Sequence, residues 1–355
     1  MTNIRTKPDR QRYTFNGFGS KAFPNFLLRG AGDLNNWHLS VYTKTHEGYQ
    51  ALRKALQMEP TDVIQEVKTS ELRGRGGAGF LTGLKWSFIT KDTDEHKFVR
   101  YLVCNADEGE PGTFKDRAII EYNPHQLIEG MVIAAWAMQC RKGFIYFRCE
   151  FKWLIDKMDA AIKEAREAGY LGTNILGSGL DFDLDTYRGA GAYVCGEETA
   201  LLNSLEGRRG EPRVKPPYPA TKGAYGQPTN VNNVETLANV PVIMRIGAQA
   251  YAAIGSPKNS GTRLFGISGH IKNPGIYEMP MGTSLRYLVE TVGGGTSSGL
   301  PIKAVIPGGI SAPVLTPEEL DTPMDFDCMA AKGSMAGSGG AIILDVSTCM
   351  VQAAL

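Results

Sequence analysis

The sequence has no long apolar run and no excess of charge of either sign, and each absence excludes a class of function. The longest apolar run, roughly Met131 to Met138, is far too short to span a bilayer. The first residues contain no apolar signal-peptide core, so we expect a cytoplasmic protein. Lys and Arg number 38 against 37 Asp and Glu, and the net charge of +1 gives no general attraction to nucleic acid or to an anionic membrane.

Cysteine and histidine are also scarce and scattered. The 6 cysteines include no C-x-x-C pair and the 5 histidines are dispersed, so neither a disulfide framework nor a local metal site is predicted. No Ser-His-Asp or Cys-His arrangement can be assembled from the spacing. Catalysis by side chains is therefore not indicated, and a protein whose cofactor performs the chemistry fits better. The remaining composition, 355 residues with 42% hydrophobic and 21% charged, is typical of a soluble globular protein of two or three domains.

Glycine, in contrast, is concentrated in two segments. The first, Glu71 to Trp86, reads E-L-R-G-R-G-G-A-G-F-L-T-G-L-K-W and holds five glycines within ten residues. Its backbone can approach a flat or charged ligand, and it is flanked by cations and aromatic rings: Arg73, Arg75, Lys85, Phe80 and Trp86. The G-x-G-x-x-G at Gly74, Gly76 and Gly79 is not a dinucleotide fingerprint, because the residues before it predict a helix and not a strand. The segment predicts a nucleotide-binding loop of another kind.

Helices and strands alternate through the first two thirds of the chain. Helices are predicted over residues 47–56 and 60–67, from Pro124 onward, and over 152–168. Strands are predicted over 98–104 and 143–148. Such alternation implies parallel strands with right-handed crossovers, hence an α/β layer. From about Gly261, strand-like pieces over 263–269, 304–309 and 341–345 surround one amphipathic helix near Leu285, which predicts a small α+β unit.

Charged loops follow these predicted elements. Asp107, Glu108 and Glu110 come directly after the first predicted strand, where a parallel sheet binds its ligands. Alone, they fit a solvated acidic turn or a Mg²⁺ or Ca²⁺ site as well as they fit a cofactor site. The second glycine segment, 188–202, leads into a helix with Glu197 and Glu198, which could bind sugar hydroxyls or only offset the helix dipole.

Several other residues near these loops could have either a structural or a binding role. Tyr193 suits a core aromatic as well as a cofactor contact, and Cys195 is predicted to pack and not to react. A proline-rich basic loop with Lys215 and Tyr218 could contact a partner or could close over a nucleotide.

Four motifs, in order, carry a resemblance to a known family. They are R-G-R-G-G-A-G-F-x-T-G-L-K-W, C-N-A-D-E-x-E-P-G-T-F-K-D-R, G-A-G-A-Y-V-C-G-E-E-T-A-L-L-N-S-L-E-G and N-V-N-N-V-E-T-L-A-N-V. From about residue 45 onward the chain resembles the flavin-carrying, NADH-oxidising F-type subunit of bacterial respiratory complex I, an NADH-quinone oxidoreductase. The same module occurs in NAD-linked hydrogenases and formate dehydrogenases.

The resemblance implies a Rossmann-like α/β domain that binds FMN and NADH, followed by a ubiquitin-like β-grasp domain. The domains would be an N-terminal arm (1–45), the FMN- and NADH-binding domain (46–255), the β-grasp domain (256–340) and the start of a helical iron–sulfur domain (341–355). Hydride would pass from NADH to FMN, and electrons would leave singly to iron–sulfur clusters. No side chain would be the catalyst, although Glu110 would assist by holding the carboxamide end of NADH.

The implied cofactor residues fall into two groups. FMN would lie among Gly74, Arg75, Gly76, Gly77, Lys85, Asn105, Asp107, Glu108, Gly196, Asn232 and Asn233. NADH would be held by Glu110, by Glu197 or Glu198 at the adenosine ribose, and by Phe80, Phe88 and Tyr218 at the adenine. Tyr193 and Lys215 are also expected to bind a cofactor. Tyr218 stands where many relatives carry Phe, which keeps the stacking face and adds a hydroxyl.

One departure from the family pattern matters. Relatives carry a C-x-x-C-x-x-C run and a distant fourth cysteine that ligate a four-iron cluster, and neither is present here. We therefore expect a fragment of a longer protein that sits on the inner face of the cell membrane through its complex, without inserting into the bilayer. The expected partners are other peripheral-arm subunits, above all a thioredoxin-like subunit with a two-iron cluster. A hydrogenase or formate dehydrogenase diaphorase and a non-catalytic scaffold are the alternatives.

Overall fold

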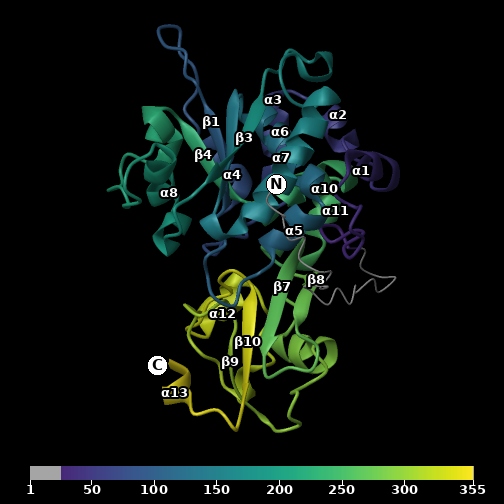
Figure 1. Cartoon of the computed structure of the whole chain (residues 1–355), viewed down its shortest axis with the longest axis vertical. Coiled ribbons are helices and arrows are strands. Elements are labelled where there is room, and N and C mark those ends of the chain that lie inside the picture. Colours follow the sequence, from purple (N-terminus) through teal and green to yellow (C-terminus); the bar gives the residue numbers. More distant parts are fainter. Residues whose placement is uncertain (1–24, 355) are drawn as a thin grey trace, which may run out of the picture.

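The computed structural model describes residues 25–354 and contains two main sheets (Figure 1). The first is a four-stranded parallel sheet of order β3-β2-β1-β4. Its strands are β1 (Tyr101–Ala106), β2 (Lys142–Phe147), β3 (Asp183–Arg188) and β4 (Thr229–Asn233). The predicted α/β layer is confirmed, and the two strands expected from sequence are its two central ones.

Alternate residues of β1 face two different hydrophobic layers. Leu102 and Cys104 belong to the main core, which the helices on one face of the sheet cover. Val103 faces a smaller cluster formed with α8 (Glu198–Leu205), in which Cys195 is also packed, as predicted. The sheet is thus covered on both faces, as parallel sheets generally are.

The central helix is α6 (Pro124–Met138), which is buried on almost every side. It contacts α10 (Val234–Ile246), α2 (Gln50–Ala55), α3 (Pro60–Thr69) and α7 (Lys152–Glu167). The amphipathic α7 buries its apolar stripe through Leu154, Met158 and Ile162. The remaining helices of this unit are α1 (Leu39–Thr45), α4 (Thr82–Ser87), α5 (Asp116–Tyr122), α9 (Pro219–Lys222) and α11 (Ala248–Ala252). No helix between residues 25 and 354 is long and apolar enough to cross a membrane.

The second sheet has the order β8-β7-β10-β9 and lies below the first unit in Figure 1. Its strands are β7 (Thr262–Gly269), β8 (Gly275–Pro280), β9 (Ile302–Ile306) and β10 (Gly340–Asp345). The central pair β7 and β10 is parallel and both outer pairs are antiparallel, which is the β-grasp arrangement that the resemblance implied.

Helical segments pack against this sheet. They are the π-helical turn Tyr287–Val292, at the helix predicted near Leu285, and α12 (Phe326–Ala331). A short ladder of β5 (Gly255–Ser256) and β6 (Asn259–Ser260) precedes the sheet, and α13 (Met350–Ala354) follows it.

The described part of the N-terminal arm, from residue 25 onward, packs on both units. The N–H groups of Leu27 and Leu28 donate to Glu278 Oε2 on β8, at 2.9 and 3.2 Å. Asn123, at the start of α6, donates to the Leu27 carbonyl at 2.8 Å. Residues 39–45 form α1, a helix that the sequence pattern did not predict. Residues 1–24 of the predicted arm lie outside the described residues.

Candidate functional site

Four separate segments meet at the carboxyl edge of the parallel sheet. Asn105 of β1 lies opposite Asn233 of β4. Asn105 Nδ2 donates to the carbonyl of Gly196 at 2.9 Å, and a Cβ added to Gly76 would lie 3.2 Å from Asn233 Cβ. The fold thus brings the first glycine loop, the second glycine segment and both polar strand ends together, at the edge where parallel sheets bind ligands.

The first glycine loop, residues 74–79, is closed at its base by backbone pairing. Arg73 and Leu81 form an antiparallel bridge, and the Gly74 N–H donates to the Phe80 carbonyl at 2.8 Å. Gly77 has a φ of +137°, and a Cβ there would meet no described atom within 4 Å. The loop therefore presents bare backbone on that side, where a flat ligand could approach closely.

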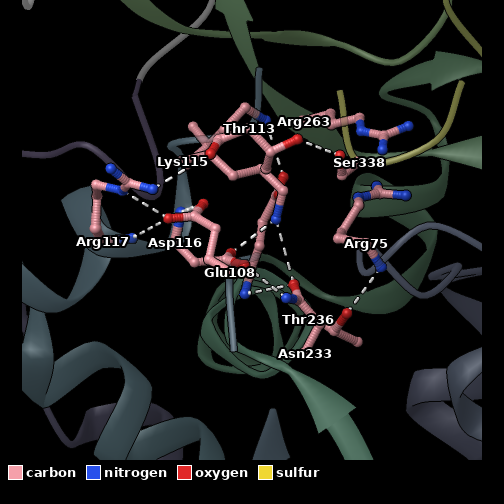
Figure 2. Close-up of polar contacts among 12 residues, drawn as sticks. Arg75, Glu108, Thr113, Lys115, Asp116, Arg117, Asn233, Thr236, Arg263 and Ser338 are labelled. Carbon is pink, nitrogen blue, oxygen red and sulfur yellow. Dashed lines mark hydrogen bonds and ion pairs between the residues drawn. The ribbon is translucent and has the colours of Figure 1, made fainter. Parts of the chain in front are cut away.

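Arg75 does not supply the positive charge expected beside this loop. Its side chain is fully buried, and Nη2 donates to the carbonyls of Ser260 and Thr262 at 2.7 and 3.1 Å. Figure 2 shows this side chain extending toward Arg263, while the Arg75 N–H donates to Thr236 Oγ1 at 2.8 Å. The Arg75 side chain fastens the glycine loop to β6 and to the first residue of β7. A role of Arg75 in binding FMN therefore stays a prediction for its backbone.

Asp107 carries a buried carboxylate oxygen without a partner. Its Oδ2 has no hydrogen bond to any residue between 25 and 354. Burial raises the pKa of Asp107 to about 6, although the Arg148 guanidinium opposes this shift. A buried acceptor left unpaired costs free energy until a donor reaches it. Asp107 is therefore poised to accept a hydrogen bond from a ligand.

Glu108, in contrast, has protein partners for both oxygens. Oε1 accepts from the Asp116 N–H at 2.7 Å, and Oε2 accepts from Arg117 Nε at 2.8 Å, as Figure 2 shows. Burial and the neighbouring Asp116 raise its pKa, against the attraction of Arg117. The Glu108 carboxylate thus binds the first turn of α5, and a contact between this side chain and FMN stays a prediction.

Glu110 is held from two sides. The Tyr193 hydroxyl donates to Oε2, and the Ser311 N–H donates to Oε1 at 2.8 Å. The hydrogen bond to Glu110, followed by burial, raises the pKa of Tyr193. Tyr193 is 62% exposed, so the core-aromatic interpretation of this residue is wrong.

Glu197 is the N-cap of α8. Its Oε2 accepts from the N–H groups of Thr199 and Ala200 at 2.8 and 2.9 Å, which satisfies two of the unpaired donors at the helix start. Burial would raise the pKa of Glu197, but hydrogen bonds from the Thr199 hydroxyl and the Ala200 N–H, together with Lys215, lower it. Glu197 therefore stabilises the start of α8, which is one of the two roles that the sequence left open.

Two lysines complete a charged cluster with these carboxylates. Lys215 Nζ lies 3.0 Å from Glu197 Oε1 and 3.2 Å from Glu198 Oε1, and Lys85 Nζ lies 2.8 Å from Glu198 Oε2. Burial would raise the pKa of Glu198, but Lys85 and Lys215 lower it. Both carboxylates are thus held ionised, and the proline-rich loop is tied to the start of α8.

Exposed aromatic rings lie close in sequence to the two lysines of this cluster. Phe80 and Phe88 are 49% and 55% exposed, with ring centroids 6.3 Å apart. Tyr218 is 59% exposed, and the Thr90 N–H donates to the Ala220 carbonyl at 3.0 Å, which joins the segments of Phe88 and Tyr218. Large exposed aromatic groups of this kind suit a flat ligand or a partner.

The two asparagines at the end of β4 are anchored by protein groups. Asn232 Oδ1 accepts from Trp86 Nε1 at 2.7 Å. Asn233 Oδ1 caps α10 by accepting from the Glu235 N–H at 3.0 Å, and its Nδ2 donates to Asp116 Oδ2 at 2.7 Å. Each side chain therefore has a fixed orientation at the floor of the site.

Sequence reasoning missed a buried ion network behind this floor. Lys115 Nζ lies 2.7 Å from Asp116 Oδ1 and 2.8 Å from Glu235 Oε2. Burial would lower the pKa of Lys115, but these two carboxylates raise it. Glu235 Oε1 also accepts from the Leu264 N–H on β7 at 2.8 Å. The available signal was the run of charges K-D-R at residues 115–117, before a predicted helix. Sequence spacing does not reveal that Glu235, which lies 119 positions after Asp116, is part of the same network.

These features define a nucleotide-binding α/β protein. A family model described as the Nuo51 FMN-binding domain matches residues 67–242, and one described as the SLBB domain matches residues 264–309. The F 2 subunit of the NADH-quinone oxidoreductase of Rhizobium meliloti (strain 1021) is 53% identical over 94% of this chain and 78% of its own length. The F subunit of the Escherichia coli (strain K12) enzyme is 50% identical over 87% of this chain and 69% of its own length. The chain therefore belongs to the family of NADH-quinone oxidoreductase F subunits, and the resemblance seen in the motifs is confirmed.

Solved structures of a related enzyme confirm the fold. A chain of the NAD⁺-reducing [NiFe]-hydrogenase in the H₂-reduced state matches with a TM-score of 0.76 and 39% identity over 87% of this chain. The air-oxidised state of that hydrogenase matches with a TM-score of 0.73. The present chain spans about half the length of the matched hydrogenase chain, 51% in both cases.

Proposed function

We propose that this chain binds FMN and NADH and is the flavoprotein subunit of an NADH-quinone oxidoreductase. The observation that carries the proposal is the unpaired, buried Oδ2 of Asp107 at the same sheet edge as the bare glycine loop. Membership of the family of F subunits supports both cofactors.

The residues at the sheet edge fit FMN. Gly76 and Gly77 leave the backbone bare for a flat ring, and Asp107 Oδ2 would accept from a ligand N–H or hydroxyl. Lys85 Nζ has three donors, of which Glu198 and the Val231 carbonyl occupy two. The third donor, with the loop amides, would bind the phosphate.

The charged cluster and the exposed rings fit NADH. Glu197 and Glu198 would accept hydrogen bonds from the adenosine-ribose hydroxyls, with Lys215 beside them. Phe80, Phe88 and Tyr218 would contact the adenine. NADPH would be disfavoured, since its 2′-phosphate would face two ionised carboxylates.

The chain positions the reaction partners and leaves the redox chemistry to the flavin. Bound FMN supplies an acceptor for the hydride of NADH and a donor of single electrons. Glu110 would orient the carboxamide end of NADH through the oxygens that Tyr193 and Ser311 hold in place. Orientation of this kind accounts for much of the rate of a transfer between two stacked rings.

We propose the same division of the chain as the resemblance implied, with the FMN- and NADH-binding domain over 46–255 and the β-grasp domain over 256–340. The expected partner is a thioredoxin-like subunit with a two-iron cluster, in a complex on the inner face of the cell membrane. A four-iron cluster needs four thiolates, and no group of three or more His, Cys, Asp or Glu between residues 25 and 354 could hold a metal ion.

A diaphorase subunit of an NAD-linked hydrogenase is the second candidate, and the structural match to a hydrogenase favours it. The sequence identity is 39% to that hydrogenase against 53% to the Rhizobium protein, which supports the first candidate.

Titration of the purified chain with FMN tests the proposal. We expect quenching of FMN fluorescence at one site, and reduction of ferricyanide by NADH much faster than by NADPH. Protein that takes up no FMN would refute the proposed function, and a scaffold role would then explain the fold.

A further inference from the structure

A loop of the β-grasp unit contacts the acidic loop that carries Asp107, Glu108 and Glu110, beside the proposed nicotinamide site. This loop, residues 307–312, follows β9 and reads P-G-G-I-S-A. Its Ser311 N–H donates to Glu110 Oε1 at 2.8 Å, and its Ile310 N–H donates to the Pro111 carbonyl at 3.0 Å. Two consecutive amides thus bind two consecutive residues of the acidic loop.

Gly309 lets the two loops approach this closely. Its φ is +94°, and a Cβ there would lie 2.5 Å from Glu110 Cγ and 2.8 Å from Glu110 Oε1. The Gly309 N–H donates to the Gly340 carbonyl at 2.7 Å, which fixes the loop on β10. Gly340 is equally close, since its Cβ would lie 2.2 Å from the Gly112 carbonyl oxygen. Any side chain at Gly309 would push the Glu110 carboxylate out of place.

The two donors to Glu110 come from different parts of the fold. Tyr193 donates from the second glycine segment of the α/β unit, and Ser311 donates from the β-grasp unit. A glutamate side chain on a loop has several rotamers, and one fixed donor on each oxygen selects one of them. Each carboxylate oxygen accepts about two hydrogen bonds, so capacity remains for a ligand N–H.

We propose that residues 309–311 are a positioning element for the nicotinamide end of NADH. The Ser311 amide orients the Glu110 carboxylate toward the carboxamide NH₂, and Gly309 keeps the space that this orientation needs. The inference rests on the proposed function, because it gives Glu110 its role there. It assigns to the β-grasp unit a direct part in binding the dinucleotide.

Gly309→Ala tests the proposal in the full chain, with Gly295→Ala as the matched control. Gly295 lies in the same unit, has a φ of +79°, and a Cβ there would meet no described atom within 4 Å. Both variants therefore carry similar backbone strain, but only the first displaces Glu110. We expect Gly309→Ala to raise the KM for NADH about tenfold, the usual size for one hydrogen bond to a charged group, with FMN content unchanged. Gly295→Ala should leave the KM unchanged.

A substrate analogue separates positioning from a general structural effect. Reduced 3-acetylpyridine adenine dinucleotide carries a methyl group where NADH carries the carboxamide NH₂, so it has no N–H for Glu110. Gly309→Ala should change its KM less than twofold, because no hydrogen bond to Glu110 is at stake. An equal loss with NADH and with the analogue would refute the inference and leave the proposed function intact.

Hydrogen exchange gives a readout independent of turnover. Glu110→Ala should speed amide exchange in the peptide 308–313, because Ser311 loses its acceptor. Unchanged exchange there would show that the contact is absent in solution and would overturn the inference. A wild-type chain that binds neither FMN nor NADH would instead refute the proposed function, and this inference with it.

Discussion

Asp107→Asn should stabilise the FMN-free protein at high pH while weakening FMN binding. In the wild type, burial raises the pKa of Asp107 to about 6, from an ordinary value of 3.8. Between these values the folded chain holds a proton that the unfolded chain has released. Stability therefore falls as pH rises through this window, and the loss is complete above pH 6.

The size of the effect follows from the shift. Two pKa units correspond to about 3 kcal/mol, which solvent screening at this partly exposed carboxylate reduces to roughly 1–2 kcal/mol. Asparagine has no charge to bury, so the variant should be more stable than the wild type by that amount at pH 8 and about equal to it at pH 4. FMN affinity should fall about tenfold or more, because a hydrogen bond to a charged acceptor becomes a neutral one.

Urea unfolding of FMN-free protein at pH 4, 6 and 8 measures the first effect, and fluorescence titration measures the second. Asp94→Asn, an exposed carboxylate in the 91–98 loop, is the control and should change neither quantity. A stability difference that stays the same at all three pH values would refute the reasoning, since it would come from packing and not from the buried charge. Unchanged FMN affinity would remove Asp107 from the proposed site.

Three other substitutions test different parts of the structure. Glu197→Gln should raise the NADPH-to-NADH ratio of kcat/KM about fivefold or more, since one charge that repels the 2′-phosphate is removed; an unchanged ratio would exclude a role for Glu197 in specificity. Lys115→Met should lower the free energy of unfolding by about 3–5 kcal/mol, because Asp116 and Glu235 lose their shared buried cation; urea unfolding checks this, and a loss under 1 kcal/mol would contradict it. Tyr218→Phe should keep the KM for NADH and Tyr218→Ser should raise it about tenfold, as expected if the ring contacts adenine; equal values for both variants would argue against that contact.

The sequence pattern predicted the elements with the clearest periodicity. The strands β1 and β2 were found because each contains a short apolar run, and the helices α6 and α7 because their apolar residues repeat at the spacing of a helix. β3 and β4 were missed. β3 reads D-L-D-T-Y-R and lies at the sheet edge, where Arg166 binds Asp183 and Asp185, so its charges hide the strand pattern. β4 reads T-N-V-N-N, and its first four residues are buried although three of them are polar, so the apolar pattern of a buried strand is absent.

The candidate site was predicted as a set of residues but not as a set of contacts. Motifs placed Asp107 and Glu110 in the same loop, yet only the fold gives Asp107 an unpaired oxygen and gives Glu110 a donor 201 positions away. Similarly, no local pattern indicates that the Arg75 side chain is buried against the residues before β7. Contacts between distant segments depend on how the two units pack, which periodicity does not report.

The charged cluster at α8 shows why one substitution should change specificity without reversing it. Glu197 Oε2 is used by the helix cap, whereas Oε1 accepts from Lys215 and keeps capacity for a ribose hydroxyl. Lys85 and Lys215 lower the pKa of Glu198, and the helix-cap hydrogen bonds together with Lys215 lower the pKa of Glu197. The Lys215 ammonium group, beside both carboxylates, could also attract a 2′-phosphate. Removing the charge of Glu197 leaves Glu198 to repel that phosphate and Lys215 to attract it. Discrimination against NADPH would therefore depend on the balance of the two carboxylates against Lys85 and Lys215, and loss of one carboxylate should weaken it and not abolish it.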